Sequence, residues 1–212
     1  MENKFSGIKI VIGLGNPGPS YKNTYHNAGK LMVDYLSEIL GTGSSGFNSG
    51  FRKKIPSGLF ESRQAHLSFS GKNLGGQVGG VVLIKPLNFM NENGKAAKLA
   101  MKSFGAMANS LLVIHDDSDL EIGKYKISFG CGSAGHNGVK SVIKSIGVKD
   151  FWRLRIGVRK TEKIQAGLYA EARRAKAGEF VLKKITEASK KTLASAFKKA
   201  SLEIFGENLI SL

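Results

Sequence analysis

Apolar runs of strand length alternate along this chain with stretches whose apolar residues recur at helical spacing. Residues 8–14 form the first run, which is rich in β-branched side chains and ends in glycines, as is typical of a buried strand. Residues 28–40 follow, with apolar side chains on one helix face at Leu31, Val33, Tyr35, Leu36 and Ile39. Strands and helices that alternate in this way must bury their apolar faces against each other, which predicts an α/β layered domain.

The same two patterns continue to about residue 158. They predict strands over 65–69, 81–85, 111–115, 125–129 and 152–158, and helices over 95–104 and 139–146. Hairpin-like spacing near residues 60–85 and 120–130 indicates that some strands run antiparallel. Residues 41–50 are rich in Gly and Ser and fit a surface loop. Without a repeat or a linker, we expect one domain, residues 1–212, with a twisted mixed central sheet flanked by helices.

The charge balance restricts the class of partner. The chain has 32 Lys and Arg against 16 Asp and Glu, a formal net charge of +16. A field of this sign attracts polyanions, and nucleic acid is the commonest of them. A basic stripe marks the C-terminal segment, where an apolar helix face with Leu182 and Ile185 lies opposite Lys183, Lys184, Lys190, Lys191, Lys198 and Lys199. This stripe fits a solvated outer face and an RNA contact equally well.

Cysteine content and hydropathy limit the location. A single cysteine, Cys131, cannot form an internal disulfide or a Cys-rich zinc site. No apolar run approaches the roughly 20 residues that cross a bilayer. Because the N-terminal residues lack the pattern of a signal peptide, we expect a cytoplasmic protein that does not enter a membrane. The alternative, an organellar protein whose presequence is missing from this sequence, stays open.

The first predicted strand leads into Gly13, Gly15 and Gly18, which have the spacing of a dinucleotide-binding loop. Pro17 interrupts that turn, and the predicted helix begins only several residues later. No second strand ends in an acid at the required distance. The glycines are therefore interpreted as a tight turn that presents Asn16.

Polar residues with catalytic potential gather at predicted strand ends and in loops: Asn16, His26, Asn91, His115, Asp116, Asp117, Asp119, His136 and Asn137. Sites in open α/β sheets lie at the carboxyl ends of strands. Asp116 directly follows the predicted strand 111–115, where it is placed to orient a histidine that acts as general base. A metal site built from His115, Asp116, Asp117 and Asp119 is the weaker alternative, because neighbouring strand residues point to opposite faces.

A series of short motifs runs in order from the first predicted strand to about residue 160: GLGNPG (13–18), Tyr21, TYHNAG (24–29), KPLNFMNENG (85–94), HDDSDLEIGKYK (115–126), AGHNGVKS (134–141) and FWRLRIGV (151–158). In order and spacing they resemble the bacterial-type peptidyl-tRNA hydrolases. The remaining third is matched more loosely, through EFVL (179–182) and the helix after it.

The resemblance implies a monomer that cleaves the ester between a peptide and the 3′ end of tRNA without a metal or cofactor. It implies that His26 is the catalytic base, Asp116 its orienting partner, and Asn16 the residue that selects N-blocked substrates. The cleft for the peptide and the terminal nucleotide would be lined by Tyr21, Phe89, Met90, Asn91, His136 and Asn137. A non-catalytic RNA-binding module of the splicing type on the same fold is the alternative.

Four departures from the family pattern affect the surroundings of the site. Tyr25 stands where Arg is usual, Asn88 where Thr or Ser is usual, and Ser128 where a basic residue for tRNA phosphate is often found. Residues 161–178 form a longer segment than the short loop of the family. Phosphate contacts are therefore expected from other cations near the cleft: Lys124, Lys126, Lys140, Arg153 and Arg155.

Overall fold

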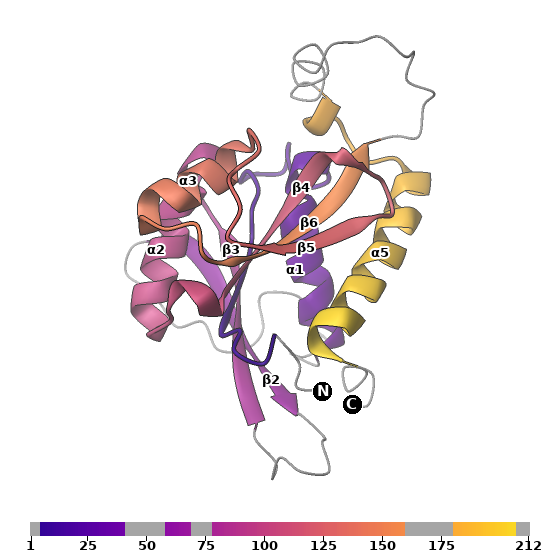
Figure 1. The fold of residues 1–212 in the computed structure, drawn as a ribbon. Helices are drawn as coiled ribbons and strands as arrows, with labels where there is room; N and C mark the ends of the chain where they lie inside the picture. Colours follow the sequence, from indigo (N-terminus) through magenta and orange to yellow (C-terminus); the bar gives the residue numbers. More distant parts are fainter. Residues whose placement is uncertain (1–4, 41–57, 69–77, 160–179, 207–212) are drawn as a thin grey trace.

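A computed structural model describes residues 5–40, 58–68, 78–159 and 180–206 of the chain. These residues form a six-stranded sheet with the strand order β2-β3-β1-β4-β6-β5 (Figure 1). The strands are β1 (Ile10–Gly13), β2 (Phe60–Ser68), β3 (Val78–Pro86), β4 (Leu111–Glu121), β5 (Tyr125–Phe129) and β6 (Trp152–Arg159).

The sheet is mixed, as the sequence predicts. Strand β1 pairs in parallel with β3 and β4, and β4 pairs in parallel with β6. The edge strands β2 and β5 run antiparallel to β3 and β6. The hairpin spacing near residues 120–130 suggests that β4 and β5 pair with each other, but they do not. Strand β6 lies between them in the sheet.

Helices cover both faces of this sheet. Figure 1 shows α1 (Ala28–Ile39) and α5 (Glu187–Phe205) on one face, and α2 (Asn93–Phe104) and α3 (Asn137–Ile146) on the other. Side chains of β1 alternate between the two layers, with Val11 in the cluster under α1 and α5 and Ile10 and Ile12 in the other. The α/β class predicted from the alternating pattern is confirmed.

Two glycines hold α1 close to the central strands. A Cβ on Gly13 would lie 2.2 Å from the carbonyl oxygen of Gly29, and one on Gly29 would lie 2.3 Å from that of Ile114. No side chain fits at either position, so helix backbone and strand backbone lie in contact. This contact brings the loop after β1 and the residues before α1 to the end of β4.

Among the predicted boundaries that are wrong, two lie next to the site. Strand β4 does not stop at His115 but continues to Glu121, because it keeps pairing with β6 through Asp116 and Asp117. Sheet hydrogen bonds thus override the low strand propensity of Asp. Helix α5 begins only at Glu187, after Thr186, whose side chain accepts the N–H of Ser189.

The C-terminal basic stripe is consequently shorter than predicted. Leu182, Lys183, Lys184 and Ile185 precede α5. Lys184 forms an isolated β-bridge with Thr24, and its ammonium donates to the carbonyl oxygens of Pro19 and Ser20. Lys190, Lys191, Lys198 and Lys199 remain as the exposed lysines of the helix itself. The segments 41–50 and 161–178 lie outside the described residues.

Candidate active site

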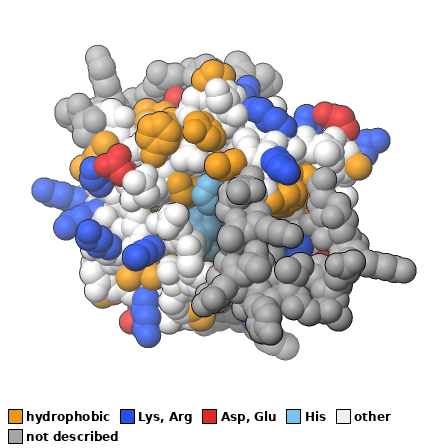
Figure 2. Space-filling view, turned by 90° about the horizontal axis from the view of Figure 1, so that it is seen from above, with side chains coloured by type: hydrophobic (Ala, Val, Ile, Leu, Met, Phe, Trp, Pro, Cys, Tyr) orange, Lys and Arg blue, Asp and Glu red, His pale blue; other side chains and the backbone are white. Residues whose placement is uncertain are grey.

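A pocket of about 510 Å³ opens at the carboxyl end of β4. Figure 2 looks onto this end of the molecule, where pale blue histidine side chains lie in a hollow between hydrophobic side chains. Residues from seven separate segments line the pocket, including Asn16, His26, Met90, Asn91, His115, Asp116, His136, Asn137, Arg153 and Arg155. Nine of the predicted site residues are among them: His26, Asp116, Asn16, Met90, Asn91, His136, Asn137, Arg153 and Arg155.

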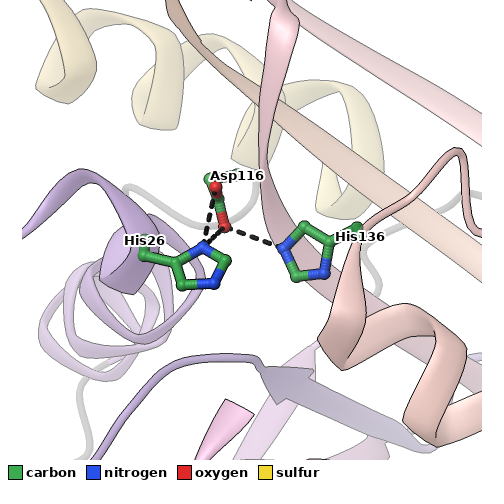
Figure 3. A group of neighbouring side chains, drawn as sticks. All are labelled: His26, Asp116 and His136. Carbon is green, nitrogen blue, oxygen red and sulfur yellow. Dashed lines mark hydrogen bonds and ion pairs between the residues drawn. The ribbon is translucent and has the colours of Figure 1, made fainter. Parts of the chain in front are cut away.

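A histidine–carboxylate pair lies in this pocket. The Nδ1 of His26 is 2.9 Å and 3.0 Å from the two carboxylate oxygens of Asp116 (Figure 3). Asp116 is 3% exposed, whereas His26 lies at the pocket wall. Because Nδ1–H donates to the carboxylate, the Nε2 of His26 carries the free lone pair.

The backbone before α1 fixes His26. His26 belongs to the 3-10 turn Tyr25–Asn27, and the buried side chain of Tyr25 anchors this turn to the C-terminal region. The Tyr25 hydroxyl is 3.0 Å from Oγ of Ser189, and its ring stacks on Phe180 at a centroid distance of 4.6 Å. Tyr25, which departs from the family pattern, thus packs away from the pocket and serves as a structural anchor.

Burial and electrostatic interactions shift the pKa values of His26 and Asp116 in opposite directions. Burial of the imidazole lowers the pKa of His26, but the Asp116 charge and hydrogen bond together outweigh burial and raise it above its ordinary value. Burial alone raises the pKa of Asp116, but the electrostatic interactions with His136 and His26 and the hydrogen bonds from both rings hold it far below its ordinary value. The carboxylate is therefore ionised throughout the physiological range.

A second imidazole contacts the same carboxylate. His136 Nε2 lies 2.9 Å from Oδ1 of Asp116, so the two rings approach the carboxylate from different sides (Figure 3). The other ring nitrogen of His136 caps α3, where it accepts the N–H groups of Gly138 and Val139 at 3.1 Å and 3.3 Å. A capping nitrogen must present a lone pair, so Nε2 carries the proton and donates to Asp116.

This tautomer bears on metal binding. His26, Asp116 and His136 offer three ligand atoms within 4.8 Å of one another, a spacing that a metal ion could use. A metal at Nε2 of His136 would require the proton on Nδ1, where it would meet the N–H groups of Gly138 and Val139. The helix cap therefore favours a proton over a metal ion at this nitrogen.

The acid-rich segment considered as a metal site does not converge on one point. Nδ1 of His115 lies 2.7 Å from the carbonyl oxygen of Asp116, and burial lowers the pKa of His115 well below its ordinary value. Asp117 accepts from Nε of Arg155 at 2.5 Å and from the N–H of Asp119 at 2.9 Å. Among the described residues, His115, Asp117 and Asp119 do not belong to the group whose ligand atoms lie close enough to hold a metal ion.

Hydrogen bonds to both its backbone and its side chain hold Asn16 in place. Its N–H donates to Oδ1 of Asn27 at 2.8 Å, and its carbonyl oxygen accepts from Nδ2 of the same residue at 3.0 Å. Its side-chain Oδ1 accepts from the N–H of Met90 at 2.8 Å. The orientation of the Asn16 amide is thus fixed, and no partner of its Nδ2 donor is found among the described residues.

The other predicted cleft residues divide into two groups. Met90, Asn91 and Asn137 line the pocket. Tyr21 and Phe89 are outside the pocket lining found among the described residues, and their rings meet edge to face at 6.3 Å. Phe89 is 52% exposed and immediately precedes Met90, so this aromatic pair forms an apolar surface beside the pocket.

The five predicted phosphate contacts have different surroundings. Arg153 is 2% exposed, and one guanidinium N–H donates to the carbonyl oxygen of Gly132. Arg155 is paired with Asp117, and Lys124 with Glu121 at 2.9 Å. Lys126 is exposed on β5 directly opposite Arg155, and Lys140 is exposed in the first turn of α3. The five cations therefore differ in burial and in local partners.

Several residues that shape the pocket were missed from the sequence. Val181 and Leu182, which precede α5, line the pocket from the C-terminal side. Asn93 accepts the N–H of Gly15 and donates to the carbonyls of Asn88 and Phe89, which joins the loop of Asn16 to that of Met90. The repeated asparagines in NFMNENG were the available signal. For residues 181–182 the available signal was the loosely matched motif EFVL (179–182).

The site consists of a buried carboxylate and two imidazoles, and it lies where the parallel central strands of a mixed sheet end. This arrangement is typical of α/β enzymes built around a histidine–carboxylate pair. Comparison with known proteins narrows this class. The family model described as Peptidyl-tRNA hydrolase matches residues 10–208. The chain belongs to the peptidyl-tRNA hydrolase family.

Relatives and solved structures agree with this assignment. The chain is 39% identical over 150 residues to the peptidyl-tRNA hydrolase of Geobacter metallireducens, which covers 71% of this chain and 68% of the relative. It is 39% identical to a peptidyl-tRNA hydrolase of a Mycobacterium species, over 70% of this chain and 69% of the relative. The crystal structure of peptidyl-tRNA hydrolase from Acinetobacter baumannii superposes with a TM-score of 0.69 at 26% identity, covering 97% of this chain and 95% of that one.

Within the described ranges, no helix has the length and apolar character needed to span a membrane.

The double role of His136 leads to a prediction. In His136→Asn, the shorter side chain can still cap α3 but is too short to reach Asp116. Loss of a neutral donor leaves the carboxylate more available to His26, so we expect the pKa of His26 to rise further. Imidazole titration by NMR measures this pKa, and a thermal melt near that of the wild type verifies the fold. An unchanged or lower pKa of His26 contradicts the arrangement.

Proposed function

We propose that the chain hydrolyses the ester between an N-blocked peptide and the 3′ end of tRNA, with His26 as general base. One observation carries this proposal: both oxygens of buried Asp116 hold Nδ1 of His26, which leaves Nε2 free at the pocket wall. A water at Nε2 can give up its proton as it attacks the ester carbonyl, and the carboxylate stabilises the imidazolium that forms.

The surrounding amides supply the remaining chemistry. Asn91 and Asn137 line the same pocket as His26, and their side-chain N–H groups can donate to the oxyanion that develops on the carbonyl. We infer that the Nδ2 of Asn16 donates to the acyl oxygen of an N-blocked substrate. A free α-ammonium offers only donors at that position, so Asn16 favours the blocked end.

The tRNA backbone is expected on the side of β5 and β6. We infer that Lys126, Lys140 and, after it exchanges Asp117 for a phosphate, Arg155 contact the tRNA. Lys124 and the buried Arg153 are left with local partners. Such contacts recognise the acceptor end without reading its sequence. We further propose that the enzyme acts as a cytoplasmic monomer.

The base is tested by replacing it. We expect His26→Ala to lower kcat for release of peptide from N-acetyl-aminoacyl-tRNA by more than the roughly 10²–10⁴-fold supplied by one proton transfer. The reaction is run with and without EDTA, and equal rates are expected in the wild type. A near-normal rate in the variant contradicts the mechanism, loss of wild-type activity in EDTA supports the metal alternative, and RNA binding without any turnover supports the splicing-type module.

The orienting carboxylate predicts a pH effect. Only neutral His26 acts as a base, and Asp116 raises its pKa above 6.5, so kcat/KM falls as the pH drops through that raised value. In Asp116→Asn the raising charge is gone. We expect the acid limb of the pH profile to move to lower pH and the plateau to fall by at least about tenfold. An acid limb that stays in place shows that another group controls it.

The tRNA contact predicts a salt effect. Lys126→Ala should raise KM for full-length tRNA substrate and flatten its log–log salt dependence by roughly 0.7–0.9 units, the value for one phosphate contact. Lys102→Ala, which removes an equally exposed lysine from the far end of α2, is the matched control. A short N-acetyl-aminoacyl-nucleotide should be hydrolysed at the same rate by the wild type and both variants. An unchanged salt slope for Lys126→Ala places the tRNA elsewhere.

A further inference from the structure

A lysine that does not line the pocket forms a hydrogen bond with the backbone of Asn16. Nζ of Lys30, in the first turn of α1, donates to the carbonyl oxygen of Asn16 at 3.0 Å. The stem of Lys30 packs on the backbone before it, since a Cβ on Gly15 would lie 2.9 Å from Cδ of Lys30. Because Asn27 holds the same carbonyl, the ammonium of Lys30 is fixed against the residue that faces the substrate.

The charges around Lys30 leave its ammonium without an ion pair among the described residues. Lys85 of β3 takes Asp34 as its partner at 2.7 Å and Glu61 at 4.0 Å. Burial and the neighbouring Lys85 lower the pKa of Lys30 to about 8, against the smaller opposite effects of Glu61 and Asp34. Lys30 is therefore protonated in neutral and mildly acidic solution.

Carboxylates outnumber guanidinium groups in the pocket lining. Asp116, Asp117 and Asp119 line the pocket together with Arg153 and Arg155, so the one excess carboxylate attracts a free α-ammonium but not a neutral acyl group. Aminoacyl-tRNA carries such an ammonium, whereas a peptidyl end does not. A cation on the Asn16 side opposes this attraction at the position where the two substrates differ.

We propose that Lys30 is a specificity-determining residue, whose fixed positive charge disfavours free aminoacyl ends in the subsite of Asn16. This inference rests on the proposed function, because it assumes that the α-nitrogen of the substrate lies beside Asn16. An amine at that place lies roughly 8 Å from Nζ, given the size of one residue. At this separation the repulsion between two unit charges, partly screened by salt, amounts to about a tenfold effect on kcat/KM.

The test compares three esters of one tRNA at pH 6.5: N-acetylphenylalanyl, phenylalanyl and phenyllactyl. Phenyllactate replaces the ammonium by a neutral hydroxyl of similar size, so the phenylalanyl-to-phenyllactyl ratio of kcat/KM isolates the charge. Lys30→Gln keeps a donor for the Asn16 carbonyl but removes the charge, and Lys30→Arg keeps the charge. Lys22→Gln is the matched control, since it removes a solvent-exposed charge from the loop between Asn16 and His26.

We expect the phenylalanyl-to-phenyllactyl ratio to rise about tenfold in Lys30→Gln and to stay at the wild-type value in Lys30→Arg and Lys22→Gln. Lys30→Met is measured in parallel, so that the charge is still tested if the Gln variant does not fold. An unchanged ratio in the neutral variants, or an equal rise in Lys22→Gln, overturns the inference. Failure of the wild type to hydrolyse the N-acetyl ester is a separate result and overturns the proposed function instead.

Discussion

The geometry of the site depends on one buried carboxylate that two imidazoles share. Asp116 receives Nδ1 of His26 and Nε2 of His136, and among the described residues these rings come from segments more than 100 positions apart. A buried carboxylate is costly unless charges or donors satisfy it. Here the satisfying groups are the two rings that line the pocket, so ionisation of Asp116 and correct placement of both rings depend on each other.

Each ring reaches Asp116 through a different structural device. His26 lies in a turn that Tyr25 anchors to Ser189 and Phe180, and the close contact of Gly29 with Ile114 sets the distance of this turn from β4. His136 follows a tight turn in which Ala134 has a φ of 49°, and its N–H donates to the carbonyl oxygen of Ser133 at 2.9 Å. A non-glycine residue in this left-handed region carries strain of order 1 kcal/mol, which the cap on α3 and the bond to Asp116 offset.

The sequence predicts the layers and the polar residues of the site, because both are local signals. Strand and helix periodicity identify the elements, and the motifs identify His26 and Asp116 as candidates that the fold then brings together. Non-local pairing decides the remainder. The length of β4 depends on β6, the partner of β5 depends on where β6 returns, and Arg155 is held by Asp117 rather than free for phosphate. None of these follows from a short stretch of sequence.

The two walls of the pocket handle charge differently, and this follows from what each wall is made of. One wall is β4. Its buried carboxylates are those of Asp116, which contacts His26 and His136, and Asp117, which pairs with Arg155. The other is the loop after β1, where neutral amides hold Asn16 and the ammonium of Lys30 approaches from behind. A proton can move between a water and His26 at the first wall, where an imidazolium is stabilised by Asp116. At the second wall a new positive charge has no such partner, so an uncharged acyl group is the better occupant.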